Sequence, residues 1–270
     1  PFVLVGEHLR KGGLSAPRID HADQAAGFLL LEDFGDATFT NLLAHGKSER
    51  QLLEMAVDTL VHLHEWPGAT DIPLPPYDTE TLLREAALFP DWFMLHRRNR
   101  ACSAPAREAY IAAWRGVFDA LPPVTPMLVL RDYHVDNLML LDGREGVDAC
   151  GLLDFQDALI GPAAYDLVSL LEDARRAIDA ELKAHLFSRY VASTSTSNPE
   201  LLDAYCAVLG AQRHAKVAGI FVRLSVRDGK PHYLKHIPHV LAMLADRLAH
   251  PLLAEVRQWF ARHSPMSGAQ

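Results

Sequence analysis

Three short apolar runs, separated by polar residues and embedded in a largely helical sequence, constrain the fold of this chain most strongly. They occupy residues 127–130, 138–141 and 150–153. A charged turn with two glycines, residues 142–146, joins the second run to the third, which predicts a β-hairpin. The remaining chain is dominated by apolar residues at helical spacing, so we predict an α+β protein with a small strand cluster inside a helical body.

The helical segments have recognisable boundaries. Apolar spacing predicts helices over 51–64, 79–95 and 105–121, the second kinked or broken at Pro90 and the third capped by Ser103. From residue 162 onward the pattern is helical, with interruptions at 193–198 and at Asp228-Gly229. Near the N-terminus, Lys11 before Gly12 indicates a helix end, and the run 28–31 predicts a buried strand that ends in a turn.

Composition excludes several classes of protein. With 270 residues, 49% of them hydrophobic, the chain can bury a sizeable core, which excludes disorder and a disulfide-stapled miniprotein. Its net charge of −8 argues against a nucleic-acid binder or a basic membrane-surface protein, and no apolar run approaches the ~20 residues of a membrane span. Three widely spaced cysteines fit a reducing compartment, so we expect a cytoplasmic protein.

Polar residues at the strand tips carry the chemical information. Asp132 and Asn137 lie between the first two apolar runs, five residues apart, and Asp154 follows the third run. Polar residues at strand ends are commonly turn formers or caps. Phosphoryl transfer, however, needs a carboxylate to take the acceptor proton and oxygen ligands for Mg²⁺, and the kinase catalytic loop has this five-residue spacing. The combination therefore favours a kinase that uses ATP and Mg²⁺.

The segments 130–137, 153–158 and 161–167 together resemble the aminoglycoside phosphotransferase and choline kinase-like superfamily, whose fold is protein-kinase-like. The resemblance implies that Asp132 is the catalytic base and that Asn137 and Asp154 are metal ligands. It also implies that Asp166 is a scaffold carboxylate that braces the catalytic segment. His134 and Asp157 are assigned supporting or substrate-binding roles.

The sequences of segments 161–173, 219–224 and 228–230 are most similar to those of one bacterial branch of this superfamily. That branch phosphorylates N-acetylmuramate and N-acetylglucosamine at the anomeric hydroxyl during peptidoglycan recycling. The resemblance implies a small-molecule sugar as the partner, with neither nucleic acid nor membrane involved. The oligomeric state is not predicted.

Two departures from the family pattern concern the loop and the N-terminus. Leu130 stands where the family has a histidine of the catalytic loop. Residues Glu32, Asp33 and Phe34 resemble the nucleotide hinge, and only 27 residues precede the strand that leads to them. We therefore expect residues 1–34 to be a remnant of the nucleotide-binding lobe, which is largely missing, and residues 35–270 to form the helical catalytic and substrate lobe.

Charge is distributed unevenly in the second half of the chain. Acidic residues prevail over 142–203, whereas basic residues prevail over 204–240. This distribution favours an acidic or neutral sugar over a polycationic antibiotic, and Arg223, flanked by apolar residues, is the best candidate for a substrate-facing cation. The basic side chains of 204–240 are Arg213, Lys216, Arg223, Arg227, Lys230 and Lys235.

Three functions follow as hypotheses. The first is ATP-dependent phosphorylation of a sugar hydroxyl, specifically the anomeric hydroxyl of an amino sugar. The second is a kinase for an aminoglycoside or an amino alcohol. The third is a catalytically inactive, kinase-like binding module, a hypothesis that Leu130 and the lack of a lysine on an apolar strand before residue 28 favour.

Overall fold

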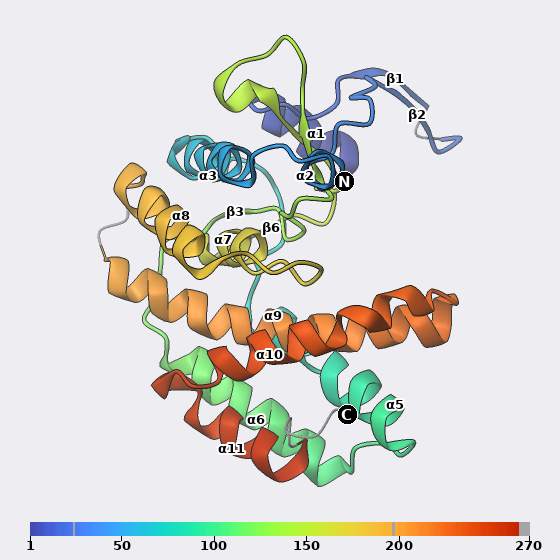
Figure 1. The fold of residues 1–270 in the computed structure, drawn as a ribbon, viewed down its shortest axis with the longest axis vertical. Helices are drawn as coiled ribbons and strands as arrows, with labels where there is room; N and C mark the ends of the chain where they lie inside the picture. Colours follow the sequence, from blue (N-terminus) through green and yellow to red (C-terminus); the bar gives the residue numbers. More distant parts are fainter. Residues whose placement is uncertain (24, 196–197, 265–270) are drawn as a thin grey trace. The chain divides into compact units, whose positions relative to one another are not determined.

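The chain packs as two units, each built from segments that are distant in sequence. The computed structural model describes residues 1–23, 25–195 and 198–264 (Figure 1). The first unit comprises Pro1–Pro76, Thr125–Leu171 and Ile178–Ser197, and the second comprises Tyr77–Val124, Glu172–Ala177 and Asn198–Gln270. This division follows from the packing of the chain, so it does not test the functional boundary predicted after residue 34.

The N-terminal part of the first unit is a helix followed by a two-stranded ribbon. Helix α1 (Phe2–Lys11) ends at Gly12, which confirms the predicted helix end at Lys11. Strands β1 (Ile19–Asp23) and β2 (Phe28–Leu31) pair antiparallel. The strand at 28–31 is confirmed, but its predicted burial is wrong, because Phe28 is 73% exposed. In the described part of the chain β2 pairs only with β1, so no third strand covers the ribbon.

The strand cluster of the first unit contains two further strand pairs. Strands β4 (Leu138–Leu140) and β5 (Cys150–Leu152) form the predicted hairpin, closed through the short helix η2 (Gly146–Ala149). Strand β3 (Met127–Val129) pairs instead with β6 (Leu159–Gly161), which the sequence did not predict. A segment with a glycine, followed directly by proline, carries a weak strand signal, and its pairing with β3 supplies the hydrogen bonds that stabilise it.

Helices pack around these strands and supply the core of the first unit. The predicted helix over 51–64 is confirmed as α3 (Glu49–Glu65), whose Ser48 side chain accepts the backbone N–H of Gln51. Its buried face packs against α8, which is next to it in Figure 1, and against α7. The other helices of this unit are α2 (Phe39–Ala44), α7 (Ala164–Leu171) and α8 (Ala180–Ser193).

The regular secondary structure of the second unit is entirely helical in its described residues. The break predicted at Pro90 is confirmed: α4 (Thr79–Ala86) gives way to a π-helical turn, η1 (Phe89–Met94). Helix α6 (Ala104–Ala120) begins at Ser103, whose side chain accepts the backbone N–H of Ala106 as predicted. The remaining helices are α5 (Leu95–Arg98), α9 (Pro199–Asp228), η3 (Pro231–His236), α10 (Ile237–Arg247), η4 (Pro251–Leu253) and α11 (Ala254–His263).

Helix α9, with 30 residues, organises the second unit. Gly219 lets it approach η1 closely, because a Cβ there would lie 2.3 Å from the carbonyl oxygen of Leu88. The helix also buries charges in ion pairs, including Lys216 with Glu85 at 2.9 Å. No helix in the described part of the chain is long and apolar enough to cross a membrane.

The interface between α3 and α8 contains a buried histidine. The Nδ1 atom of His64 hydrogen-bonds the hydroxyl of Tyr190 at 2.8 Å, and both side chains are almost fully buried. Burial lowers the pKa of His64 from 6.5 to about 4, because a charged imidazolium would lose its hydration there. The folded state therefore keeps His64 neutral over a pH range in which the unfolded chain binds a proton.

This shift predicts an acid-sensitive contribution to stability. Above pH 6.5 both states are neutral at His64, whereas between pH 6.5 and 4 only the unfolded state is protonated, so the free energy of unfolding falls as the pH is lowered. We expect a loss on the order of 2 kcal/mol at pH 5 relative to pH 8 from this group. Urea unfolding of wild type and His64→Asn across this range measures it.

The His64→Asn variant should show a smaller drop between pH 8 and pH 5 than wild type. The exposed His96 on α5 provides the control, and His96→Asn should retain the wild-type pH dependence. Equal pH slopes for wild type and His64→Asn would show that His64 does not contribute in this way.

Candidate active site

A buried carboxylate organises the loop that follows β3. Asp166, in the first turn of α7, is 0% exposed. Its Oδ2 accepts the backbone N–H of Leu130 at 2.6 Å and its Oδ1 accepts that of Arg131 at 2.8 Å. Arg131 has a φ of 71°, a left-handed conformation that costs free energy for a residue with a Cβ. The two charge-assisted hydrogen bonds stabilise this turn.

Asp132 follows the left-handed residue directly. Its backbone N–H donates to the carbonyl of Leu130 at 2.9 Å, and its own carbonyl accepts the N–H of His134 at 3.2 Å. The chain therefore makes tight successive turns here, and the side chain of Asp132 remains half-buried, whereas that of His134 is buried. Leu130, which replaces the family histidine, is itself buried and packs in the core.

Asn137 brings the three predicted chemical residues together. Its side-chain Nδ2 donates to the carbonyl of Asp132 at 2.9 Å and to Oδ2 of Asp154 at 3.4 Å. Its carbonyl also accepts the backbone N–H of Leu153 at 3.0 Å, which extends the contact between the two sides of the β4–β5 hairpin. Asp132, Asn137 and Asp154 thus form one local group, as the sequence predicted from their positions at the strand tips.

Asp154 is held in an unusual conformation at the end of β5. Its φ is 56°, so Asp154 is, after Arg131, the second non-glycine residue of this group with a left-handed backbone. Its Oδ1 accepts a hydrogen bond from Nε2 of Gln156 at 2.5 Å, and its side chain is exposed. Such a strained backbone persists only where its surroundings hold it, and here it directs the carboxylate toward Asn137.

The donor atoms of Asn137 and Asp154 fit a hard divalent cation. The amide oxygen of Asn137 and the carboxylate of Asp154 are the ligand types that Mg²⁺ prefers. Within the residues that the structure describes, no group of three or more His, Cys, Asp or Glu side chains is placed to hold a metal ion by itself. Two protein ligands suffice for Mg²⁺ in phosphoryl-transfer sites, because phosphate oxygens and water complete its coordination.

The predicted hinge residues lie beside the same hairpin. The backbone of the segment that follows them pairs with β4, through a bridge from Thr38 to Met139 and a hydrogen bond from Leu140 N–H to the carbonyl of Ala37 at 2.9 Å. Asp33 is exposed and accepts the N–H of Gly35 at 2.7 Å. The half-buried residues Glu32 and Phe34 contact the loop of the hairpin.

Two contacts of the loop were not expected from the sequence. The side chain of Thr40 donates a hydrogen bond to Asp136, which ties α2 to the loop. Nη1 of Arg131 donates to the carbonyl of Asp157 at 3.1 Å, so Asp157 contributes its backbone here while its side chain is exposed. Thr40 and Asp136 are 96 residues apart, and no local pattern could have connected them.

The basic side chains predicted for the substrate belong to the second unit and differ in their surroundings. Lys216 is paired with Glu85, and Arg227 with its neighbour Asp228 at 2.6 Å, so their charges are largely compensated. Arg223 lies half-buried on α9, and its Nε atom is buried without a hydrogen-bond partner. The substrate-binding role of Arg223 stays a prediction.

Comparisons with known proteins identify the family to which this chain is similar. The model of the APH phosphotransferase enzyme family matches residues 2–205. An N-acetylmuramate/N-acetylglucosamine kinase of Caulobacter vibrioides is 36% identical, over 98% of this chain and 75% of that protein. The protein of the same name from Neisseria meningitidis is 40% identical, over 86% of this chain and 70% of that protein.

Solved structures share the fold at low sequence identity. A choline/ethanolamine kinase family protein from Mesorhizobium loti aligns with a TM-score of 0.63 and 13% identity, over 95% of this chain and 82% of that chain. The gentamicin–APH(2")-IIa complex aligns with a TM-score of 0.57 and 15% identity, over 89% and 80% of the two chains. The predicted kinase-like fold is thereby confirmed, whereas the largely missing N-terminal lobe stays a prediction. The chain is a kinase that belongs to the phosphotransferase enzyme family.

Proposed function

We propose that this kinase transfers the γ-phosphate of ATP to the anomeric hydroxyl of an amino sugar in the cytoplasm. The observation that carries the proposal is the Asn137 side chain, which hydrogen-bonds both the Asp132 carbonyl and the Asp154 carboxylate. The acceptor class is inferred from relatives that are named N-acetylmuramate/N-acetylglucosamine kinases and are 36% and 40% identical.

Asp132 acts as the base toward the sugar. Its carboxylate accepts the proton of the anomeric hydroxyl as the hydroxyl oxygen attacks the γ-phosphorus. The bond from this phosphorus to the β,γ-bridging oxygen breaks, and ADP leaves with the electron pair. Hydrogen bonds to the backbone N–H and carbonyl of Asp132 fix the point from which its side chain projects, which lowers the entropic cost of positioning the base during the reaction.

Asn137 and Asp154 are the proposed magnesium ligands. When bound there, Mg²⁺ neutralises charge on the phosphate oxygens. Gln156, which donates to Asp154, restrains the orientation of that carboxylate. Asp166 acts one step further away, because it fixes the turn from which Asp132 projects.

The nucleotide base is proposed to bind along the hinge Glu32, Asp33 and Phe34. The backbone of Asp33 and Phe34 has N–H and C=O groups that can pair with the edge of a purine, whereas the N–H of Glu32 already donates to the carbonyl of Arg18 at 2.8 Å. The segment that follows the hinge pairs with β4, so the same hairpin positions both the proposed site of the base and the proposed metal ligands.

In the first unit, His134 and Asp157 are proposed to support the loop or to bind the substrate. For Arg223, on α9 of the second unit, we keep the substrate-binding role that the sequence predicts. N-acetylmuramate carries a carboxylate, which a guanidinium binds well. Arg223 is the proposed partner because its Nε atom is buried without a hydrogen-bond partner. An aminoglycoside or amino-alcohol acceptor, being cationic, would be repelled by such a group.

The first test compares acceptors and removes the base. We expect the complete gene product to consume ATP with N-acetylmuramate and N-acetylglucosamine in a coupled ADP-release assay, and to be much less active with kanamycin or choline. Asp132→Ala should lower kcat by roughly 10²- to 10⁴-fold, because it removes general-base catalysis and leaves substrate binding in place.

The matched control is Asp119→Ala, which removes an exposed aspartate of α6 and should leave kcat unchanged. Phosphorylation of kanamycin or choline in preference to the sugars would overturn the proposed acceptor. A wild-type protein that phosphorylates no acceptor, or Asp132→Ala with wild-type kcat, would favour the inactive binding module.

The second test concerns the scaffold carboxylate. Asp166→Ala leaves the N–H groups of Leu130 and Arg131 without their buried acceptor, which costs about 1–3 kcal/mol for each group. We expect the free energy of unfolding in urea to fall by about 3 kcal/mol or more, with a loss of kcat. Asp58→Asn, which breaks a partly exposed ion pair with Arg189, should cost less than about 1 kcal/mol. Equal destabilisation by the two variants would contradict this role of Asp166.

A further inference from the structure

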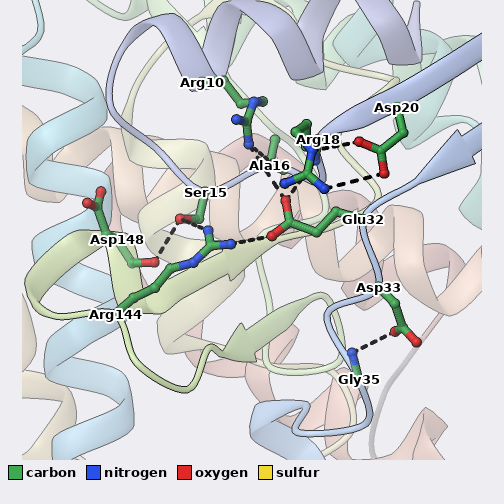
Figure 2. Close-up of polar contacts among 10 residues, drawn as sticks. All are labelled: Arg10, Ser15, Ala16, Arg18, Asp20, Glu32, Asp33, Gly35, Arg144 and Asp148. Atoms are coloured by element: carbon green, nitrogen blue, oxygen red, sulfur yellow. Dashed lines mark hydrogen bonds and ion pairs between the residues drawn. The ribbon is translucent and has the colours of Figure 1, made fainter.

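The carboxylate of Glu32, at the end of β2, is the centre of a polar network in the first unit (Figure 2). Its Oε1 receives the guanidinium of Arg144. Its Oε2 accepts the backbone N–H of Arg18 at 3.0 Å and lies 3.8 Å from Nη1 of Arg10. The Glu32 side chain is only 17% exposed, so the ionised form of its carboxylate depends on these partners for stabilisation more than that of a surface carboxylate does.

Arg144 connects this carboxylate to the hairpin loop between β4 and β5. One arm of its guanidinium, Nη2, reaches Glu32, and the other arm, Nη1, donates to the hydroxyl of Ser15 at 2.8 Å. Ser15 in turn donates to the carbonyl of Asp148, in the same loop, at 2.7 Å. Figure 2 shows Arg144 pointing from the loop toward Glu32, with Ser15 beside it. A single guanidinium therefore joins the hinge to the loop and to the segment after α1.

Arg144 also contacts Phe34, the hinge residue two positions after Glu32. Its Cζ lies over the ring of Phe34, 5.5 Å from the ring centroid, which is a cation–π contact. The ring also lies close to Gly151 of β5, where an added Cβ would lie 2.9 Å from the ring carbons. Phe34 is thus held between the arginine of the loop and the backbone of β5.

The hairpin that Arg144 anchors also carries the proposed metal ligands. Asn137 immediately precedes β4, and Asp154 follows β5 by two residues. The carbonyl of Ser15 accepts the N–H of Leu152 at 2.7 Å, so the segment held by Arg144 is bound to β5 as well. The hinge and the metal ligands are consequently attached to opposite ends of one short hairpin.

Without Arg144, Glu32 would retain the backbone N–H of Arg18 and the more distant Arg10. The ribbon β1–β2 is largely exposed and pairs with no other strand in the described part of the chain, so it offers little resistance to movement of the hinge. Phe34 would also lose its cation–π contact with Arg144. The hinge then gains freedom relative to the hairpin, while Asn137 and Asp154 keep their own contacts.

We propose that Arg144 is a positioning residue for the nucleotide: by holding Glu32 and Phe34 against the β4–β5 hairpin, it sets where the base lies relative to the metal ligands. In this role Arg144 acts through its contacts with Glu32 and Phe34. This inference rests on the proposed function, because it assigns the hinge to the base of ATP.

The test separates the base from the phosphates. In the complete gene product, Arg144→Met should raise the KM for ATP about tenfold, with kcat and the KM for N-acetylglucosamine changed less than about twofold. The inhibition constant of magnesium tripolyphosphate, which has no base, should be unchanged. Arg144→Lys keeps the charge but not the two-armed contact, so its KM for ATP should be intermediate.

Two further measurements exclude a general structural effect. Arg189→Met removes a two-armed ion pair with Asp58 in the same unit and serves as the matched control, with an unchanged KM for ATP. In a double-mutant cycle with Glu32→Gln, the losses of ADP affinity measured by calorimetry should be strongly non-additive, because both changes break the same pair.

Each outcome is decisive. A wild-type KM for ATP in Arg144→Met, an equal rise in Arg189→Met, or an equal rise in the tripolyphosphate inhibition constant would overturn the inference. Loss of ADP affinity in Arg144→Met, in a protein that phosphorylates none of the sugars, would support the inference and reject the proposed acceptor. A wild-type protein that binds no ADP would reject both.

Discussion

The pair of hydrogen bonds from Leu130 and Arg131 to the buried carboxylate of Asp166 is the interaction on which the site depends. A left-handed arginine is unfavourable by itself, and an ionised carboxylate without donors could not be buried. Each therefore requires the other. Because the turn is fixed in this way, Asp132 leaves the strand in a set direction, and the loop that follows can return to Asn137 and β4.

The β4–β5 hairpin extends this local order to the rest of the first unit. Asn137 and Asp154 lie at one end of it and the loop with Arg144 at the other, while the chain after the hinge pairs along β4. The short strands would not be stable as an isolated hairpin. They are held by the packing of α3 against β3, β5 and η2, so the helical core supports the geometry of the polar residues.

The sequence predicted the elements well where local rules apply. Ser103 begins a helix as a cap, Pro90 breaks a helix, and the glycine-containing turn 142–146 closes a hairpin. It failed where the decision is not local. The run 28–31 is apolar and became a strand, yet it is exposed, because burial depends on what covers a strand rather than on its own composition. Strand β6 forms because β3 is available to pair with it.

By itself the sequence determined which residues stand at the strand tips and that their spacing matches phosphoryl transfer, since spacing along one loop is a local property. Only the tertiary structure decided how those tips are held: Asp166 reaches back 36 residues to Leu130, and Arg144 reaches back 112 residues to Glu32. Contacts over such separations are selected by the packing of the whole unit, because the entropy of closing the loops is repaid by the core and not by the contacting residues alone.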